Sequence, residues 1–238
     1  MPMLNFRLAQ PELLVDLGAI DELSGVDVSS DWVRIGAMTR YAQLMAHPDV
    51  CRLLPLAARA LPHVAHPAIR NRGTVGGSIA LADPAAELPA VMSALGARFC
   101  VAGPDGERTI NADDFFEGLY ETALEDDELL TAIEVPAAAA DDRFGFCEIA
   151  RRHGDYAMAG VAIALRQGQP SIVFFAVSDR PARAVGAEAV LKNDRSAIDA
   201  AVDALGDIDF ARDLNASAET KRHLAGVVLR RAWNEVMS

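Results

Sequence analysis

The chain has 238 residues, and its 34 acidic against 22 basic side chains give a formal net charge of −12 at pH 7. Nucleic acids and anionic membranes are therefore poor candidates as partners, because their negative charge would repel the chain at long range. With 51% hydrophobic and 24% charged residues the composition is that of a folded globular protein, and the length suits one large domain or two modest ones.

The segment before residue 65 predicts two strands followed by two helices. In chain order these are residues 13–17, 32–36, 39–45 and 51–61. The first strand is a run of apolar residues closed by Gly18, and the second alternates apolar with polar side chains. Thr39 is expected to cap the first helix. His47-Pro48 is expected to end it, because the residue before a proline disfavours helical backbone.

A glycine-containing stretch separates these helices from the rest of the N-terminal half. Residues 66–78 show no regular pattern, and Gly73, Gly76 and Gly77 lie close together, which predicts a loop. The apolar spacing of residues 88–95 then predicts a buried helix that begins near Asp83 and ends at Gly96. The remaining elements expected before residue 137 are a strand at 98–101, a turn at 104–106, a short capped helix at 111–116 and a strand at 129–135.

A small-residue, then acidic, stretch at 137–142 predicts a domain boundary, which divides the chain into residues 1–138 and 139–238. Beyond it, the strands expected are 144–150, 159–165 and 172–177, and the helices are 182–191, 196–205 and 218–236. Strands followed by helices, rather than strict alternation, predict an α+β fold. Its C-terminal domain is expected to be a three-stranded antiparallel sheet with a helical layer on one face.

The glycine loop is the segment best suited to hold a cofactor. Glycines let a backbone approach a bulky anion and adopt positive φ, so that the N–H groups of residues 74–78 can converge on phosphate oxygens. The Thr74 and Ser78 hydroxyls add donors, and Arg70 and Arg72 bring positive charge. The alternative is a tight turn that happens to contain two glycines, and spacing alone does not decide between the two.

Other well-known chemical motifs are missing. There is no GxGxxG or GxxxxGK[ST] nucleotide motif, and no HExxH, GxSxG or EF-hand spacing. The three cysteines are far apart, which argues against a zinc site or an iron–sulfur cluster in this chain and fits a reducing cytoplasm. The histidines predict no metal site, although His63 and His66 leave a metal pair open beside a capping or surface role. No apolar run approaches the roughly 20 residues that cross a bilayer.

Several distinctive segments nevertheless resemble one known family, in the right order. They are Ile69–Ser78 followed by Ala82–Pro89, Asp114–Gly118 with Thr122–Leu124 and Glu128–Leu130, Ala150–Ala157, and Pro181–Ala184 with Ala187-Glu188. Together they resemble the FAD-binding medium subunit of the molybdenum hydroxylases, a group that includes aerobic carbon monoxide dehydrogenase and xanthine dehydrogenase. The resemblance covers essentially the whole chain.

The resemblance implies a role in electron transfer and two kinds of partner subunit. Such a subunit holds one FAD between its N-terminal and C-terminal domains. A large molybdopterin-binding subunit oxidises the substrate, and electrons pass through a small subunit with two [2Fe-2S] clusters to the flavin and then to an acceptor. The redox chemistry belongs to the cofactor, and the protein supplies position and electrostatics. The implied protein is a cytoplasmic oxidoreductase subunit, complete only with its partners.

The resemblance also implies cofactor-binding residues, with no catalytic residue and no metal ligand among them. They are Thr74, Val75, Gly76, Gly77, Ser78, Ile79, Glu87, Leu130, Asp155 and Tyr156. Residues 74–78 match the loop that contacts the diphosphate, and Glu87 matches an acid that faces the nucleotide. Ile79 and Leu130 match apolar positions beside the ring or adenine.

Tyr156 matches a place where an aromatic ring lies against the isoalloxazine, with Asp155 orienting its turn. The alternative for this pair is a turn acid beside a core tyrosine. Arg151 and Arg152, just upstream, are expected either to meet phosphate or to lie on an exposed strand edge.

The start of the chain departs from the family pattern. Relatives carry a strand, a helix, another strand and a first glycine-rich loop ahead of the segment Pro2–Leu8, so we expect an N-terminally shortened FAD-binding domain. A late gene start is one explanation, beside a trimmed chain or a shortened homologue. Each lost charge-assisted hydrogen bond to the diphosphate costs about 1.5 to 3 kcal/mol. The 238-residue chain is therefore expected to bind FAD weakly or not at all.

Two further functions stay open at this level. One is a cofactor-free scaffold or assembly protein derived from the same fold, which the missing first loop favours. The other is a nucleotide-binding regulator that uses the second loop alone.

Overall fold

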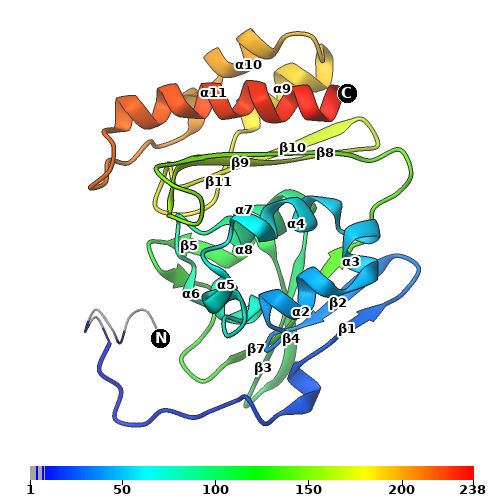
Figure 1. Cartoon of the computed structure of the whole chain (residues 1–238), viewed down its shortest axis with the longest axis vertical. Helices are drawn as coiled ribbons and strands as arrows, with labels where there is room; N and C mark the ends of the chain where they lie inside the picture. Colours follow the sequence, from blue (N-terminus) through cyan, green and yellow to red (C-terminus); the bar gives the residue numbers. More distant parts are fainter. Residues whose placement is uncertain (1–3, 5–6, 8) are drawn as a thin grey trace.

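Two antiparallel sheets with their helices stack along the long axis of the molecule (Figure 1). The computed structural model describes residue 4, residue 7 and residues 9–238. The segment Pro2–Leu8, expected to be the end of a glycine-rich loop, therefore lies largely outside the described residues. The mixture of helices with antiparallel sheets confirms the predicted α+β class.

The N-terminal sheet has five strands in the order β1-β2-β7-β3-β4. Their bounds are β1 (Val26–Val28), β2 (Trp32–Gly36), β3 (Arg98–Gly103), β4 (Gly106–Asn111) and β7 (Leu129–Pro136). The strands predicted at 32–36, 98–101 and 129–135 are confirmed, and the turn at 104–106 joins β3 to β4. A small hairpin of β5 (Phe116–Gly118) and β6 (Glu121–Thr122) follows the short helix α8 (Ala112–Phe115).

The long connection from β2 to β3 supplies the helices that lie between the two sheets and at the edge of the molecule. They are α2 (Tyr41–Ala46), α3 (Pro48–Leu53), α4 (Pro55–Ala60), α5 (Pro67–Arg70), α6 (Val75–Leu81) and α7 (Glu87–Leu95). Short 3-10 turns, η1 (Asp21–Leu23) and η2 (Leu61–His63), precede β1 and follow α4. Helix α7 is buried along its whole length and ends at Gly96, whose positive φ closes it as predicted.

Three local predictions for the segment before residue 65 are wrong. Residues 13–17 form no strand, since no described strand pairs with them, and Leu13 is 76% exposed. Thr39 does not cap α2, because its hydroxyl bonds instead to the N–H and C=O of Gly25. The expected end of the helix at His47-Pro48 is confirmed, because α2 ends at Ala46 and Pro48 begins the next helix, α3. The helix expected at 51–61 is broken at Leu54, because Pro55 starts a new helix where its missing N–H costs nothing.

The C-terminal sheet has four strands in the order β11-β10-β9-β8. They are β8 (Arg143–Ala150), β9 (Ala157–Arg166), β10 (Gln169–Phe175) and β11 (Ala182–Arg183). The three predicted strands are confirmed, but a three-stranded sheet is wrong. Residues 182–183, expected to open a helix, instead pair with β10 as a short edge strand.

Helices cover both faces of this sheet, not one. On the outer face lie α9 (Val185–Asn193), α10 (Ile198–Asp203), the 3-10 turn η3 (Leu205–Asp207) and α11 (Ala218–Met237) (Figure 1). On the inner face α7 packs against β9 and β10, and α4 against β8. Because both faces are covered, β9 is buried along nearly its whole length. The two parts of the chain thus share an interface, and the cavity described next opens at its edge.

Candidate functional site

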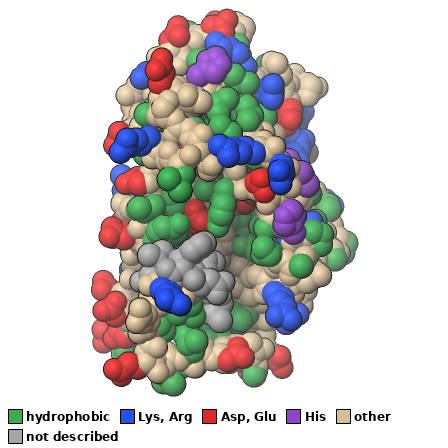
Figure 2. Space-filling view, turned by 60° about the vertical axis from the view of Figure 1, so that its left-hand side comes forward, with side chains coloured by type: hydrophobic (Ala, Val, Ile, Leu, Met, Phe, Trp, Pro, Cys, Tyr) green, Lys and Arg blue, Asp and Glu red, His purple; other side chains and the backbone are tan. Residues whose placement is uncertain are grey.

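A cavity of about 1130 Å³ lies where the segment from α5 to α7 meets the β8–β9 connection. Six of the ten predicted cofactor-binding residues line it, namely Thr74, Gly77, Ser78, Glu87, Asp155 and Tyr156. Figure 2 shows this side of the molecule, where hydrophobic side chains gather in the middle of the face. At one edge the β8–β9 turn touches the opposite wall, since a Cβ on Gly154 would lie 3.0 Å from the Ala65 carbonyl. Residues separated by some 80 positions in sequence therefore share one site.

The glycine segment is a helix and not the predicted loop. Thr74 is the N-cap of α6, and its hydroxyl accepts a hydrogen bond of 3.1 Å from the Gly77 N–H. Helical backbone suits this run because the cap satisfies one of the free N–H groups of the first turn. The segment therefore presents side-chain hydroxyls and a bare glycine to the cavity, on a regular and rigid element.

The backbone donors of this segment are already engaged within the protein. The N–H of Val75 donates to Thr39 O at 2.9 Å, and the N–H of Gly76 donates to Ala37 O at 2.8 Å. The Ser78 N–H donates to Thr74 O at 3.2 Å, as part of the helix. A nest of free amides that converges on a diphosphate is therefore wrong for this structure. The polar groups left for a ligand here are mainly the Thr74 and Ser78 side chains.

The two adjacent glycines serve different purposes. A Cβ on Gly76 would lie 2.4 Å from the Ala37 Cβ and 2.7 Å from its carbonyl oxygen, so Gly76 lets α6 pack directly against the end of β2. Gly77 is exposed and lines the cavity, and a Cβ there would meet only the Thr74 hydroxyl, at 2.8 Å. Gly76 is thus needed for packing, while Gly77 leaves the cavity wall open to close approach by a ligand.

The other four predicted residues do not reach the cavity. Val75, Gly76, Ile79 and Leu130 are buried and lie outside its lining. Val75 and Ile79 face inward from α6, and Leu130 lies on β7 in the same hydrophobic core. Helical periodicity and strand alternation turn Ile79 and Leu130 into the core rather than into the cavity wall. Their contact with a ring or adenine stays a prediction.

Among the acids that line the cavity, Glu87 has the most strongly shifted pKa. It is the first residue of α7, is 7% exposed and lines the cavity. Burial raises the pKa of its carboxyl to about 7, and the negative charges of Glu148 and Asp83 act in the same direction. Its own backbone N–H and the charge of His63 oppose the rise. A group that is half protonated at neutral pH can either donate to or accept from a polar ligand.

Tyr156 stands at the rim of the cavity, with Asp155 beside it. Its side chain is 61% exposed, which excludes the alternative of a core tyrosine. Desolvation of the phenol oxygen and the nearby Asp83 carboxylate raise the pKa of Tyr156 to about 12. The side chain is therefore neutral at physiological pH and offers an uncovered aromatic face to a planar ligand.

Some residues of the cavity wall carry no signal in the sequence, and others had two expected roles. Arg72 and Arg151 both line the cavity, whereas Arg70 donates to the carbonyls of Val64 and Ala65 and serves the fold. Lining residues with no sequence signal include Met38, Tyr41, Met158 and Asn215. Asn215 illustrates the reason, since it comes from the distant loop before α11 and only the fold brings it here.

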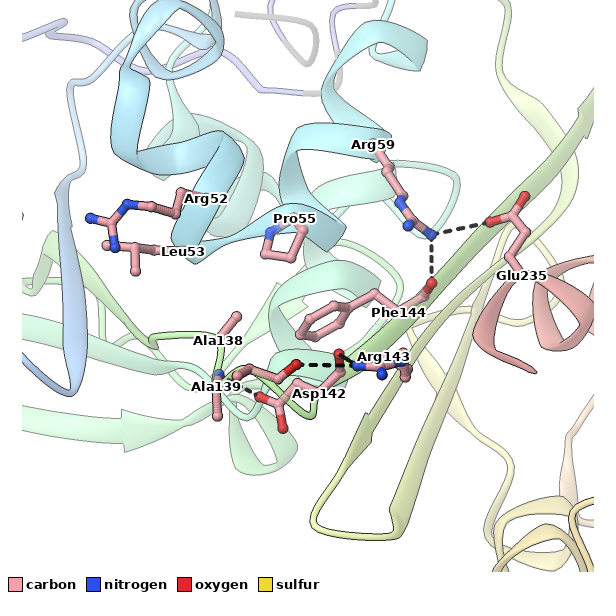
Figure 3. A pocket seen from close by; sticks show the side chains of 11 residues that line it. Arg52, Leu53, Pro55, Arg59, Ala138, Ala139, Asp142, Arg143, Phe144 and Glu235 are labelled. Atoms are coloured by element: carbon pink, nitrogen blue, oxygen red, sulfur yellow. Dashed lines mark hydrogen bonds and ion pairs between the residues drawn. The ribbon is translucent and has the colours of Figure 1, made fainter. Parts of the chain in front are cut away.

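A second hollow of about 400 Å³ lies beside α3, α4 and β8 (Figure 3). It contains several arginines, but their donors are already engaged. Arg59 donates to the Phe144 carbonyl and lies 3.4 Å from the Glu235 carboxylate, and Arg143 donates to the carbonyls of Ala140 and Asp142. In Figure 3, Arg59 points to Glu235 rather than into open space. This hollow is a weaker candidate than the larger cavity.

Metal and membrane sites are not found among the described residues. No group of three potential metal ligands occurs there, and His63 contacts Glu148 rather than His66. None of the helices in the described part of the chain is long and apolar enough to cross a membrane.

Comparison with known families decides the relationship. Residues 1–138 match the family model described as the FAD binding domain in molybdopterin dehydrogenase. Residues 144–236 match the CO dehydrogenase flavoprotein C-terminal domain. The chain belongs to the FAD-binding medium-subunit family of the molybdenum hydroxylases. It is accordingly a subunit of the flavin-dependent oxidoreductase type, as the resemblance implied.

Individual relatives agree with this placement. The chain is 38% identical to the carbon monoxide dehydrogenase medium chain of Hydrogenophaga pseudoflava, over 98% of this chain and 85% of that protein. It is equally identical to the nicotine 6-hydroxylase medium subunit of Paenarthrobacter nicotinovorans, over 97% of this chain and 84% of the relative. The solved carbon monoxide dehydrogenase from H. pseudoflava that lacks the Mo-pyranopterin moiety superposes with a TM-score of 0.95 at 40% identity. That match covers 99% of this chain and 85% of the other. These family members are medium subunits of multi-subunit enzymes that act on different substrates.

Proposed function

We propose that the cavity binds FAD and that the chain passes electrons from iron–sulfur clusters to an acceptor, within a molybdopterin-dependent hydroxylase or dehydrogenase complex. The observation that carries this is the joint lining of one cavity by Thr74, Gly77 and Ser78 from α6 and by Asp155 and Tyr156 from the β8–β9 connection. Bound FAD would supply the exchange of one and two electrons. The partners we infer are a large molybdopterin-binding subunit and a small [2Fe-2S] subunit.

The cavity suits such a ligand in size and in the hydrogen-bond donors that it presents. Its volume of about 1130 Å³ is large for a small-molecule site, as an elongated dinucleotide requires. The Thr74 and Ser78 hydroxyls, with Arg72 and Arg151, are the donors available to a diphosphate. Gly77 lets the ligand approach α6 closely. Val75, Gly76, Ile79 and Leu130 would support this wall from the core.

The remaining site residues suit the other parts of a flavin nucleotide. The Glu87 carboxyl can exchange hydrogen bonds with the hydroxyls of a ribityl or ribose chain. The uncovered Tyr156 ring provides a face for a planar heterocycle, and Asp155 belongs to the turn that holds this ring. Apolar side chains such as Met38, Leu81 and Met158 complete the wall and exclude water.

We further propose that residues 1–138 form the FAD-binding domain and residues 139–238 the second domain, with the ligand between them. The three cysteines are all free thiols, which fits a reducing cytoplasm as the place of action. The acidic net charge fits protein partners rather than nucleic acid.

By itself, the chain of residues 1–238 is expected to bind FAD weakly. The amides of Val75, Gly76, Gly77 and Ser78 are already hydrogen-bonded inside the protein, so they are not free to donate to a diphosphate. Each missing charge-assisted bond costs about 1.5 to 3 kcal/mol, so even two reduce affinity by about two powers of ten or more. Dialysis of purified protein followed by an absorption spectrum measures this. A protein that remains yellow would contradict the expectation.

The same occupied amides favour one second candidate, a cofactor-free scaffold or assembly protein. Co-expression with the large and small subunits, followed by flavin analysis of the purified complex, separates the two. We expect close to one FAD per copy of this chain in the complex. An assembled complex with no flavin would support the scaffold and contradict the proposed electron transfer.

A further inference from the structure

The charge of the cavity lining does not suit an anionic dinucleotide. Arg72 and Arg151 contribute two positive charges, and Asp83, Glu87 and Asp155 contribute three negative ones when ionised. FAD carries two negative charges on its diphosphate, and it would enter a cavity that already has an acidic balance. Binding is therefore opposed unless one of the acids is neutralised.

An acid–histidine pair lies behind the wall that carries Glu87. Glu148 belongs to β8, and its side chain is only 4% exposed. Its Oε1 lies 3.0 Å from Nδ1 of His63, whereas its buried Oε2 has no hydrogen-bond partner. The His63 side chain, at the end of η2, is 34% exposed. Glu87, Glu148 and His63, here called the acid–histidine cluster, thus extend from the cavity wall to the surface.

The charges of the cluster act on one another. The hydrogen bond to Glu148 raises the pKa of His63, with desolvation opposing it and the charges of Glu148 and Glu87 supporting it. The pKa of Glu87 is about 7, as described above. Glu87 in the cavity wall therefore changes protonation near neutral pH, while the contact with Glu148 makes His63 easier to protonate than an isolated imidazole.

Other titratable groups that face the cluster carry no compensating charge. Outside the cluster, Asp83 is the further acid acting on Glu87, while Tyr41 and Tyr156 lie near it with pKa values of about 12 and stay neutral. The His153 ring lies 5.5 Å from the His63 ring, on the solvent side of the cluster. Glu87 is thus the group most easily neutralised by a proton.

We propose that the acid–histidine cluster takes up one proton when an anionic dinucleotide enters the cavity, so that Glu87 is held as the neutral acid beside the ligand. Glu87 lines the cavity and takes this proton from the solvent there. The negative charge of the buried Glu148, whose Oε2 has no partner, favours the uptake, and the charge of the partly exposed His63 opposes it. The incoming dianion raises the energy of every nearby carboxylate, and Glu87 is already half protonated. This inference rests on the proposed FAD site and adds a proton to its binding equilibrium.

Proton uptake fixes the sign of the pH dependence. Binding that takes up a proton weakens as pH rises through the pKa of the free protein. If Glu87 titrates near 7 when free and stays protonated when FAD is bound, the Kd for FAD is about tenfold lower at pH 6 than at pH 8. FAD itself has no group that titrates between these values, so the change reports on the protein.

The experiment measures Kd by quenching of FAD fluorescence at pH 6 and pH 8, at constant ionic strength and with protein up to high concentration. The wild-type chain should show the tenfold change. Glu87→Gln should bind FAD at pH 8 as it does at pH 6. Glu148→Gln removes a negative charge that raises the pKa of Glu87, so it should show a larger pH effect than wild type. Asp199→Asn removes one exposed acid on α10 and serves as the charge-matched control, with the wild-type pH dependence retained.

The possible results separate the inference from the proposed function. FAD binding that is independent of pH in the wild type, or equally dependent in Glu87→Gln, would overturn proton uptake and leave the FAD site standing. No quenching at either pH in the wild type and in all variants would overturn the FAD site, and the inference with it.

Discussion

A single buried carboxyl, Glu87, links the stability of the protein to its ligand site. The group is ionisable, nearly inaccessible and close to two other acids, so its charge is disfavoured in the folded state. In the unfolded chain the same carboxyl titrates near 4.5. The folded state therefore binds the proton more tightly than the unfolded state does, and folding becomes sensitive to pH between these two values.

Glu87→Gln is expected to reduce the loss of stability at rising pH. In the wild type, the proton on the Glu87 carboxyl stabilises the fold, fully below pH 4.5, and this stabilisation is lost as pH rises through about 7. The unfolding free energy should therefore fall by roughly 2 to 3 kcal/mol between pH 5 and pH 8. Gln mimics the neutral acid at every pH, so the difference in unfolding free energy between variant and wild type should shift by this amount. Urea denaturation at both pH values measures it, and parallel profiles would contradict the raised pKa.

The two glycines of α6 are expected to respond differently to alanine. Gly76→Ala should destabilise the fold by about 2 to 3 kcal/mol, because the new methyl group would overlap the Ala37 backbone. Gly77→Ala should cost only about 1 kcal/mol, the value of the Thr74 cap it disturbs, and should mainly weaken FAD binding. Thermal melts and FAD titrations of both variants measure these effects. Equal losses of stability would show that the assignment of roles is wrong.

At the scale of elements, the long helix α11 depends on one close contact with the C-terminal sheet. A Cβ on Gly145 in β8 would lie 2.2 Å from the Ala232 carbonyl oxygen of α11. Beside this contact, the Trp233 ring is buried in the core between sheet and helices, with its N–H bonded to the Arg195 carbonyl. The helix is therefore seated directly on the backbone of the strand.

Gly145→Ala should move α11 away from the sheet and lower the unfolding free energy by about 2 to 3 kcal/mol. Gly18→Ala is the control, because Gly18 is exposed and its added methyl group would meet only the flexible Asp16 carboxylate. A thermal melt and the tryptophan fluorescence, to which the buried Trp233 contributes beside Trp32, follow the change. A Gly145→Ala protein as stable as the control would contradict the close packing.

A helix or strand can be predicted from the sequence when the residues that cause it lie within the element itself. The strands β7, β8 and β9 are confirmed because apolar runs bounded by turn residues depend on local pattern alone. The sequence predicts a loop at residues 73–77, although Thr74 caps a helix there. The reason is that the close packing of Gly76 against Ala37, which favours the helix, is not visible in the sequence. The residues 13–17 were expected to be a strand from their composition, but pairing needs a neighbouring strand, which composition does not supply.

At the scale of the whole molecule, the candidate site exists only where the two parts of the chain meet. The family resemblance predicts Thr74, Glu87 and Tyr156 as cofactor-binding residues, and all three line the cavity. The motif did not separate cavity-lining positions from core positions, so Ile79 and Leu130 were included although they face inward. Asn215 and Tyr41 could not be predicted as site residues from the sequence, because their place in the cavity wall depends on the tertiary fold.

A crystal structure of the chain grown with excess FAD tests the central claim most directly. We predict electron density for FAD in the large cavity, with the diphosphate beside the Thr74 and Ser78 hydroxyls and a planar ring against Tyr156. Density for FAD elsewhere on the molecule, or none in this cavity at saturating FAD, would contradict the claim that the chain holds its flavin between α6 and the β8–β9 connection.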